Sequence, residues 1–401
     1  MTLSAKTYCP TVQEKPAQET AGVLPLSWPQ EGVWFFEQAS PGSASYNIAQ
    51  AWWLEGRVYS AALREALGDI VQRHEILRTA FGAKDGKPCQ IIFPPKPFPL
   101  SCVDLRFHPT PDAEAERQAN WDAQCAFKLT QEPLVRITLF RTADEKQLLA
   151  LNMHHLISDA WSIGVFMREM AISYSARKSG QTPCLPPLPI QYGDFTLWQR
   201  DLRQADQFRD NLDYWTRQLR GAPPLLVMPA DWPRPAVATN LGATLLFDWP
   251  APLATGLKKL ALEKGATVYQ LLLSAFTILL QRCTLQDDIV VGSPFAGRDE
   301  LETENLIGFF VNTHALRVNL AADPTFAQLL ERIRETTLGA HSHQQIPLQD
   351  IVRALDTDRT MAAHAIFQIA FGLQHDFTEG WSLPGISASP LDLDNGASKF
   401  D

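Results

Sequence analysis

One stretch of the chain constrains its architecture more than any other. Residues 180–189 read GQTPCLPPLP and hold four prolines in ten positions. Proline lacks a backbone N–H and has a fixed φ, so such a stretch cannot form a helix interior or a central strand. We therefore predict an extended linker here. Because 401 residues suffice for two or three compact units, we expect a lobe on either side of it.

Helix and strand signals alternate on both sides of this linker. Helical periods are present at residues 61–74, 111–126, 211–220, 254–264, 268–282 and 324–343, and strand patterns at residues 77–81, 135–140, 147–153, 244–248 and 288–295. Each lobe should therefore combine a sheet with helices, in the α/β (α+β) class. The predicted division is a flexible tail at 1–21, an N-terminal lobe at 22–180, the linker at 181–189 and a C-terminal lobe at 190–401.

Composition excludes several classes of function. The formal net charge is −9 and no basic face is evident, which argues against a nucleic-acid partner. Six cysteines lie scattered without a C-x-x-C spacing, as expected for reduced thiols in a cytoplasmic protein without a metal site. The longest apolar stretch, residues 271–280, is shorter than the ~20 residues of a membrane span. We predict no membrane partner.

The strongest chemical signal is the segment MHHLISDAWS at residues 153–162. A predicted strand runs into His154 and His155, and Asp159 follows four residues later. Adjacent side chains on a strand point to opposite faces, so one imidazole should face a cavity and the other should pack. A neutral imidazole can accept a proton or stabilise a charged intermediate. Spacing alone is equally compatible with ordinary packing, and Asp159 could be a proton acceptor or a structural anion.

HHLISDAWS resembles the HHxxxDG core of the condensation domains of nonribosomal peptide synthetases. Other segments resemble further motifs of that family, in the family's order: LSWPQEGVWF (26–35), RHEILRTAF (73–81), YGDFTLW (192–198), IGFFVNTHALR (307–317) and HQQIP (343–347). The resemblance extends over residues 24–401. Six ordered motifs are far more specific than one histidine–histidine–aspartate triplet.

The resemblance implies a fold and a function. The expected fold is two chloramphenicol acetyltransferase-like lobes in a V-shaped pseudo-dimer with a tunnel between them. The expected reaction is amide bond formation between a carrier-bound acyl or aminoacyl thioester and a carrier-bound amino acid. The partners would be an upstream donor and a downstream acceptor peptidyl carrier protein, whose 4'-phosphopantetheine arms deliver the substrates. No cofactor would bind to the chain itself.

The resemblance also assigns roles to residues of the central motif. His155 matches the family's catalytic histidine and should face the tunnel, with His154 packed behind it. Asp159 matches an aspartate that is mainly structural and pairs with an arginine. The expected partner is Arg78, with Arg73 as second choice, because a buried carboxylate is tolerated only when it is paired.

Three further residues are assigned to the substrate tunnel: Ala160, Trp161 and Asn312. The amide of Asn312 could hold an acyl or amide group, or equally satisfy buried backbone. Ala160 stands where the family has glycine, which would permit a left-handed backbone. We therefore expect Ala160 to narrow the tunnel or to tilt His155.

Two departures from the family pattern keep other functions open. Residues 359–367 match the family's seventh motif poorly, and the chain ends at ASKFD, where the family continues with more strand and a helix. The C-terminal lobe is therefore expected to be truncated at its end, either in a shortened protein or in a piece of a longer synthetase. The alternatives are a degenerate docking platform that binds a carrier or tailoring enzyme without chemistry, and an ester-forming or freestanding acyltransferase.

Overall fold

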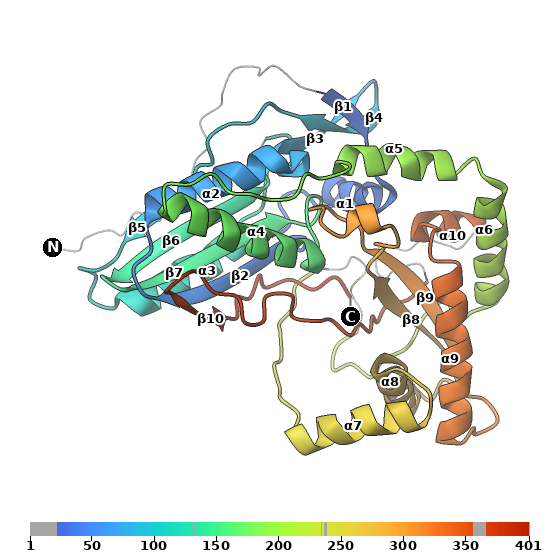
Figure 1. Ribbon diagram of the computed structural model, residues 1–401. Coiled ribbons are helices and arrows are strands. Elements are labelled where there is room, and N and C mark those ends of the chain that lie inside the picture. Colours follow the sequence, from blue (N-terminus) through green and yellow to red (C-terminus); the bar gives the residue numbers. More distant parts are fainter. Residues whose placement is uncertain (1–21, 132, 234, 236–238, 356–365, 401) are drawn as a thin grey trace.

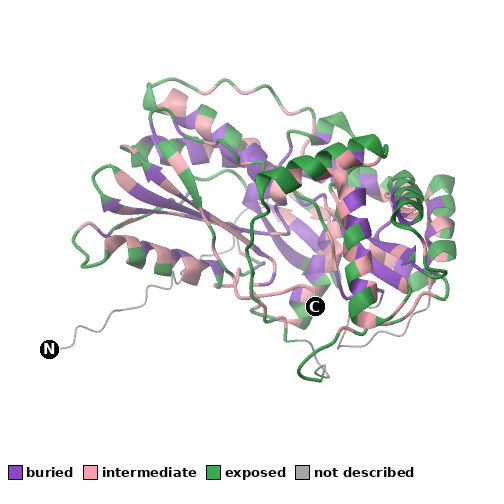
Figure 2. Cartoon of the chain, turned by 90° about the horizontal axis from the view of Figure 1, so that it is seen from below, coloured by how far each residue is buried: buried purple, intermediate pink, exposed green. Residues whose placement is uncertain are grey.

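The computed structural model describes residues 22–131, 133–233, 235, 239–355 and 366–400. The predicted tail at 1–21 and most of the weakly matching segment 359–367 lie outside this part of the chain. Figure 1 shows two bodies side by side, each combining sheet and helix. In Figure 2 the buried residues gather on the strands and on the inward faces of the helices.

The first body is built on a five-stranded sheet of order β10-β2-β7-β6-β5. Its strands are β2 (Asn47–Glu55), β5 (Ser101–Asp104), β6 (Val135–Ala143), β7 (Lys146–His154) and β10 (Ser387–Leu391). The predicted pairing of the strands around residues 135–140 and 147–153 is confirmed, because β6 and β7 are antiparallel neighbours. Strand β7 lies between β2 and β6 and is buried along almost its whole length. It carries the histidine pair at its carboxyl end.

Helices cover both faces of this sheet. On one face α2 (Ser60–Arg73) and α4 (Ala160–Lys178) pack over the strands (Figure 1) and form the main apolar core with them. On the other face α3 (Pro111–Ala123) packs its alanines against β6 and β7. The helix predicted at 61–74 is confirmed as α2, whose buried face has a helical period.

Further elements extend the first body toward the second. A small sheet of order β1-β4-β3 contains β1 (Gly22–Pro25), β3 (Thr79–Lys84) and β4 (Lys87–Ile92). The strand predicted at 77–81 begins at Thr79, because a 3₁₀ turn, η1 (Glu75–Arg78), precedes it. Helices α1 (Trp28–Ala39) and α5 (Tyr192–Leu202) contribute side chains to the same core. Residues 181–189 form neither helix nor strand.

The second body packs helices on a two-stranded antiparallel sheet, β8 (Asp288–Phe295) and β9 (Asn312–Asn319). Its helices are α6 (Asp206–Leu219), α7 (Ala251–Glu263), α8 (Val268–Thr284), α9 (Phe326–Ser342) and α10 (Leu348–Ala354), with the 3₁₀ turn η2 (Leu301–Thr303) before β9. Taken singly, no helix within the described ranges has the length and apolarity to cross a membrane; α7 and α8 meet that test only as a pair bent by 105°.

The strand predicted at 244–248 is wrong. These residues are described outside any strand, and Leu245 and Phe247 are 85% and 72% exposed. Alternating apolar residues favour a strand only when a neighbouring strand supplies backbone hydrogen bonds. Within the described ranges β8 pairs with β9 and bridges to Ala370, and neither contact reaches residues 244–248.

The chain returns from the second half of the sequence to the first body. Strand β10 pairs with β2, and Leu383 and Ile386 join the core of the first body. The predicted lobe of residues 190–401 therefore does not account for this segment. The pairing has a physical reason, since it covers an edge of β2 that would otherwise leave backbone donors and acceptors unpaired.

His314 of β9 gives the second body a pH dependence. Its ring is fully buried and stacks on Trp215 at 4.9 Å. Burial lowers the pKa of His314 to about 3, although the backbone of Gln344 acts in the opposite direction. Below an ordinary histidine pKa of ~6.5, His314 is protonated in the unfolded chain but stays neutral in the folded chain. The free energy of unfolding therefore falls as the pH falls from ~6.5 toward 3.

We expect His314→Leu to flatten this dependence. Between pH 7.5 and 5.5 the wild-type free energy of unfolding should fall by about 1 kcal/mol more than that of the variant. Urea denaturation at the two pH values measures the difference. Equal losses in both proteins would show that His314 does not cause the pH dependence.

Candidate functional site

The histidine pair lies where β7 leaves the sheet. His154 is the last residue of the strand and is 1% exposed, whereas His155 follows the strand and is half-buried. The backbone N–H of His155 donates to the carbonyl of Tyr46 at 2.8 Å, which holds the first residue after the strand in place. The two imidazoles therefore start from a rigid support and enter different environments.

His154 is engaged by its surroundings. Its Nδ1 accepts the backbone N–H of Leu156 at 3.1 Å, so the ring proton is assigned to Nε2. That nitrogen lies 3.5 Å from Oε1 of Glu37 on α1. Burial lowers the pKa of His154, with Glu37 acting in the opposite direction. This geometry fits a neutral ring that supports the loop.

His155 has a different environment. Its ring meets Phe309 edge to face at 5.2 Å and Tyr46 at 6.0 Å between centroids. Burial holds the pKa of His155 well below its usual range, and the charges of Lys399 and His154 lower it further. The imidazole is therefore neutral near pH 7 and keeps a lone pair for a donor such as an amine.

Asp159 is a buried and fully engaged anion. It caps the N-terminus of α4, where one carboxylate oxygen accepts the N–H of Ser162 at 2.8 Å. The other oxygen accepts the N–H of Phe310 at 3.1 Å. Arg298 lies 3.2 Å away, and both side chains of this ion pair are 2% exposed. Of the two roles left open by the sequence, the contacts fit the structural anion.

The predicted partners of Asp159 are wrong. Arg78 pairs with Glu75 at 3.2 Å and donates to the carbonyl of Phe93, and Arg73 pairs with Glu169 at 3.0 Å. Both arginines belong to the motif at residues 73–81, where the carboxylates of Glu75 and Glu169 and the carbonyl of Phe93 engage them. Sequence reasoning missed Arg298, whose only signal is its place just after the buried strand β8.

Arg298 joins the two bodies. Its guanidinium donates to the carbonyl of Leu306 at 2.9 Å, to that of Thr303, and to Oγ of Ser162 at 2.7 Å. It also lies 4.0 Å from the ring centroid of Phe310. Burial lowers the pKa of Arg298, and Asp159 opposes that effect. The arginine thus ties the loop after β8 to the start of α4.

Residues 306–310 supply backbone groups that Arg298, Ser162 and Asp159 contact. Leu306, Ile307, Phe309 and Phe310 belong to the apolar core of the first body. Tyr192 of α5 donates to the carbonyl of Phe309 at 2.5 Å. A Cβ on Gly308 would lie 2.1 Å from the ring of Tyr192, so only glycine allows this close approach. The segment that presents Phe309 to His155 is therefore held on both sides.

The three residues assigned to the tunnel have different surroundings. Ala160 is the first residue of α4 and has no positive φ, so this chain makes no use of a left-handed backbone at that position. Trp161 donates its indole N–H to the carbonyl of Glu304 at 2.8 Å, a contact that links the two bodies. The amide of Asn312 donates to the carbonyls of Gln344 and Ile346 at 3.0 and 2.8 Å. That is the backbone-satisfying role left open above.

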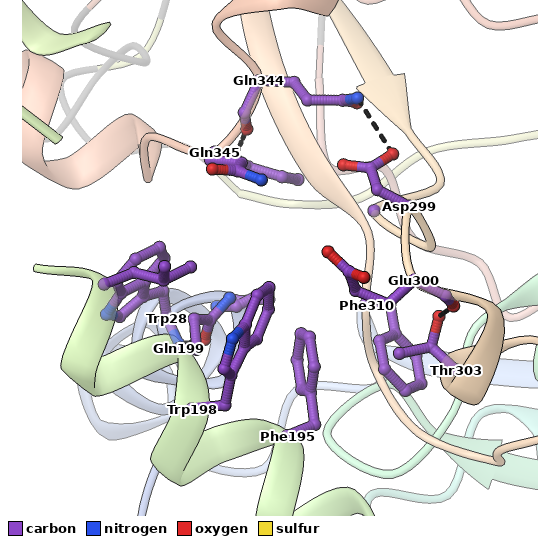
Figure 3. Close-up of a pocket in the computed structure, with 14 residues that line it drawn as sticks. Trp28, Phe195, Trp198, Gln199, Asp299, Glu300, Thr303, Phe310, Gln344 and Gln345 are labelled. Atoms are coloured by element: carbon purple, nitrogen blue, oxygen red, sulfur yellow. Dashed lines mark hydrogen bonds between the residues drawn. The ribbon is translucent and has the colours of Figure 1, made fainter. Parts of the chain in front are cut away.

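A pocket lies beside Phe310, between α1, α5, the loop around η2 and residues 344–345 (Figure 3). Its lining includes Phe195, Trp198 and Phe310 on the aromatic side and Asp299 and Glu300 on the acidic side. Asn312 lines it, whereas His155, Ala160 and Trp161 do not. Within the described ranges, no three histidine, cysteine, aspartate or glutamate side chains gather as a metal-binding group.

Comparison with known proteins agrees with this arrangement. The family model of the condensation domain matches residues 20–401. The chain belongs to the condensation-domain family. The resemblance based on six ordered motifs is thereby confirmed, and members of this family are acyltransferases of nonribosomal peptide synthesis.

Two curated relatives and one solved structure illustrate this membership. Malpinin synthetase of Mortierella alpina is 38% identical over 99% of this chain and 5% of its own length. Phosphinothricin tripeptide synthetase PhsC of Streptomyces viridochromogenes is 40% identical over 91% of this chain and 34% of its own length. The X-domain from teicoplanin biosynthesis is 28% identical, with a TM-score of 0.85 over 96% of this chain and 85% of that chain. The condensation domain thus spans a small part of these synthetases, and the predicted fold class is confirmed.

We expect the Asp159–Arg298 pair to dominate the stability of the site. Asp159→Asn and Arg298→Ala should each destabilise the condensation domain by ~3–5 kcal/mol, because each strands a buried partner. Their combination should cost less than the sum, since the second change removes an already stranded group. Urea denaturation of the single and double variants measures the coupling.

Arg78→Ala is the matched control. Its combination with Asp159→Asn should be additive within ~0.5 kcal/mol, because the two residues share no contact. Additive losses for Asp159→Asn with Arg298→Ala would instead contradict the assigned ion pair.

Proposed function

We propose that this condensation domain forms an amide bond between a carrier-bound acyl or aminoacyl thioester and the amine of a carrier-bound amino acid. His155 is the proposed catalytic residue. The observation that carries the proposal is the contrast within the motif: His154 and Asp159 are engaged by protein groups, whereas His155 is half-buried directly after a rigid strand, with its ring against Phe309 and Tyr46.

The proposed chemistry follows from the low basicity of His155. The amine nitrogen attacks the thioester carbon, the C–S bond breaks, and the proton lost by nitrogen ends on the departing thiol. A ring with a lowered pKa is a poor acceptor for a proton in the resting site. His155 is therefore proposed to accept a hydrogen bond from the amine and to take its proton only as positive charge develops on nitrogen.

The substrates and partners follow from this chemistry. A donor and an acceptor peptidyl carrier protein would each present a substrate on a 4'-phosphopantetheine arm, and the chain would need no cofactor of its own. Ala160, Trp161 and Asn312 remain proposed boundaries of the tunnel, and residues 22–180 and 190–401 remain the proposed lobes, apart from the returning strand β10.

A second candidate is a docking platform without chemistry. It is favoured by the likeness to the X-domain in the complex of the X-domain and OxyB from teicoplanin biosynthesis, with a TM-score of 0.84 and 28% identity. The presence of both histidines and of a satisfied Asp159 favours the enzyme. Ester formation on a hydroxyl acceptor would use the same histidine, and an assay with both acceptor types separates it from amide formation.

We expect His155→Ala to lower amide formation by ~10²–10⁴-fold, the usual contribution of a general acid–base group. His154→Ala should act mainly through stability, because it leaves the N–H of Leu156 without its acceptor. Single-turnover transfer between loaded carrier proteins, followed by mass spectrometry, measures the rates, and thermal melts measure folding.

The result separates the candidates. Full activity in a folded His155→Ala protein would remove its catalytic role. Carrier binding without amide or ester formation by the wild-type chain would favour the docking platform.

A further inference from the structure

A late segment of the chain, residues 395–400, lies against the start of β2, the strand that pairs with the histidine-bearing β7. The side-chain amide of Asn395 donates to the carbonyls of Asn47 and Ala44 at 3.3 and 3.4 Å. The N–H of Ser398 donates to the carbonyl of Asn240 at 2.9 Å. Phe400 packs against the core of the second body. Residues 395–400 therefore lie between the start of β2 and a loop of the second body.

Lys399 of this segment lies over the ring that lines both histidines. Its Nζ is 4.9 Å from the centroid of Tyr46. The Tyr46 centroid is 6.0 Å from that of His155 and 6.5 Å from that of His154, and the carbonyl of Tyr46 accepts the N–H of His155. The lysine side chain and both histidines therefore contact the same aromatic ring.

Charged groups reach the histidines from several elements. Glu37 of α1 faces His154, and Arg136 of β6 lowers the pKa of that ring. Asp159 is turned toward Arg298 and the N-terminus of α4. For His155 the charge with the largest effect is Lys399, which comes second only to burial in lowering its pKa.

We propose that Lys399 is a positioning residue of this site, which holds Tyr46 against the His155 imidazole and places a positive charge beside the histidine pair. The proposal rests on the proposed function of His155. A cation near the ring disfavours imidazolium, so it suppresses protonation of the base in the resting site.

The pKa of Lys399 is itself lowered. Burial lowers the pKa of Lys399 to about 8, so it is mostly charged at pH 7 and loses its proton in mildly alkaline solution. Tyr46 stays neutral beside the lysine, because burial and Glu37 raise the pKa of Tyr46 to about 12.

Two measurements on the full chain test the proposal: the pH dependence of kcat/KM for amide formation, and an NMR titration of the His155 ring, assigned with His155→Ala. In Lys399→Met the pKa of His155 should rise, and the acidic limb of the rate profile should move to higher pH. Lys399→Arg keeps the charge and should leave both unchanged. Lys399→Gln provides a second neutral variant should Lys399→Met fail to fold.

Lys178→Met is the matched control, because Lys178 also lies over a tyrosine, Tyr59, at 5.4 Å, but on α4 near its C-terminus. It should move neither readout. An unchanged His155 pKa in the neutral variants, or an equal rise in Lys399→Arg, would overturn the proposal. A rise in that pKa without amide formation by any protein would support Lys399 and count against the proposed function.

Discussion

The ion pair between Asp159 and Arg298 is the interaction on which the geometry of the site depends. A carboxylate and a guanidinium that are both withdrawn from water are stable together only when their remaining donors and acceptors are also engaged. Here the first turn of α4, Ser162 and residues 303–310 engage them. His155 lies four residues before Asp159 on the same loop. A residue of the second body therefore positions the histidine loop of the first.

This arrangement separates the aspartate from the histidine. In serine hydrolases an aspartate bonds to the catalytic imidazole and stabilises its protonated form. Here Asp159 is turned toward Arg298, and the charged neighbour that acts most on His155 is a lysine. The site is therefore built for a neutral imidazole of low basicity. Such a ring would suit the proposed amine nucleophile, which needs less help to attack a thioester than a hydroxyl group would.

The sequence predicted the parts of this structure that depend on local pattern. The antiparallel pair β6 and β7 follows from periodicity, and so does helix α2. The ordered motifs indicated the fold. Arg298 was missed because it stands 139 positions from Asp159, and no local pattern relates the two. Arg78 was chosen because it lies in a recognisable motif, yet Glu75 is three residues away and engages it. The strand predicted at 244–248 was wrong for a related reason. A strand needs a neighbouring strand for its hydrogen bonds, and alternation in the sequence does not show whether one is present.

Three separated parts of the chain meet at the histidines: the loop after β7, residues 298–310 and residues 395–400. The first supplies the imidazoles, the second supplies Arg298 and Phe309, and the third supplies Lys399. Because Asp159 and Arg298 lie in different bodies, separation of the two bodies would break their ion pair. A substitution at Arg298 should change the histidine environment although it touches neither ring.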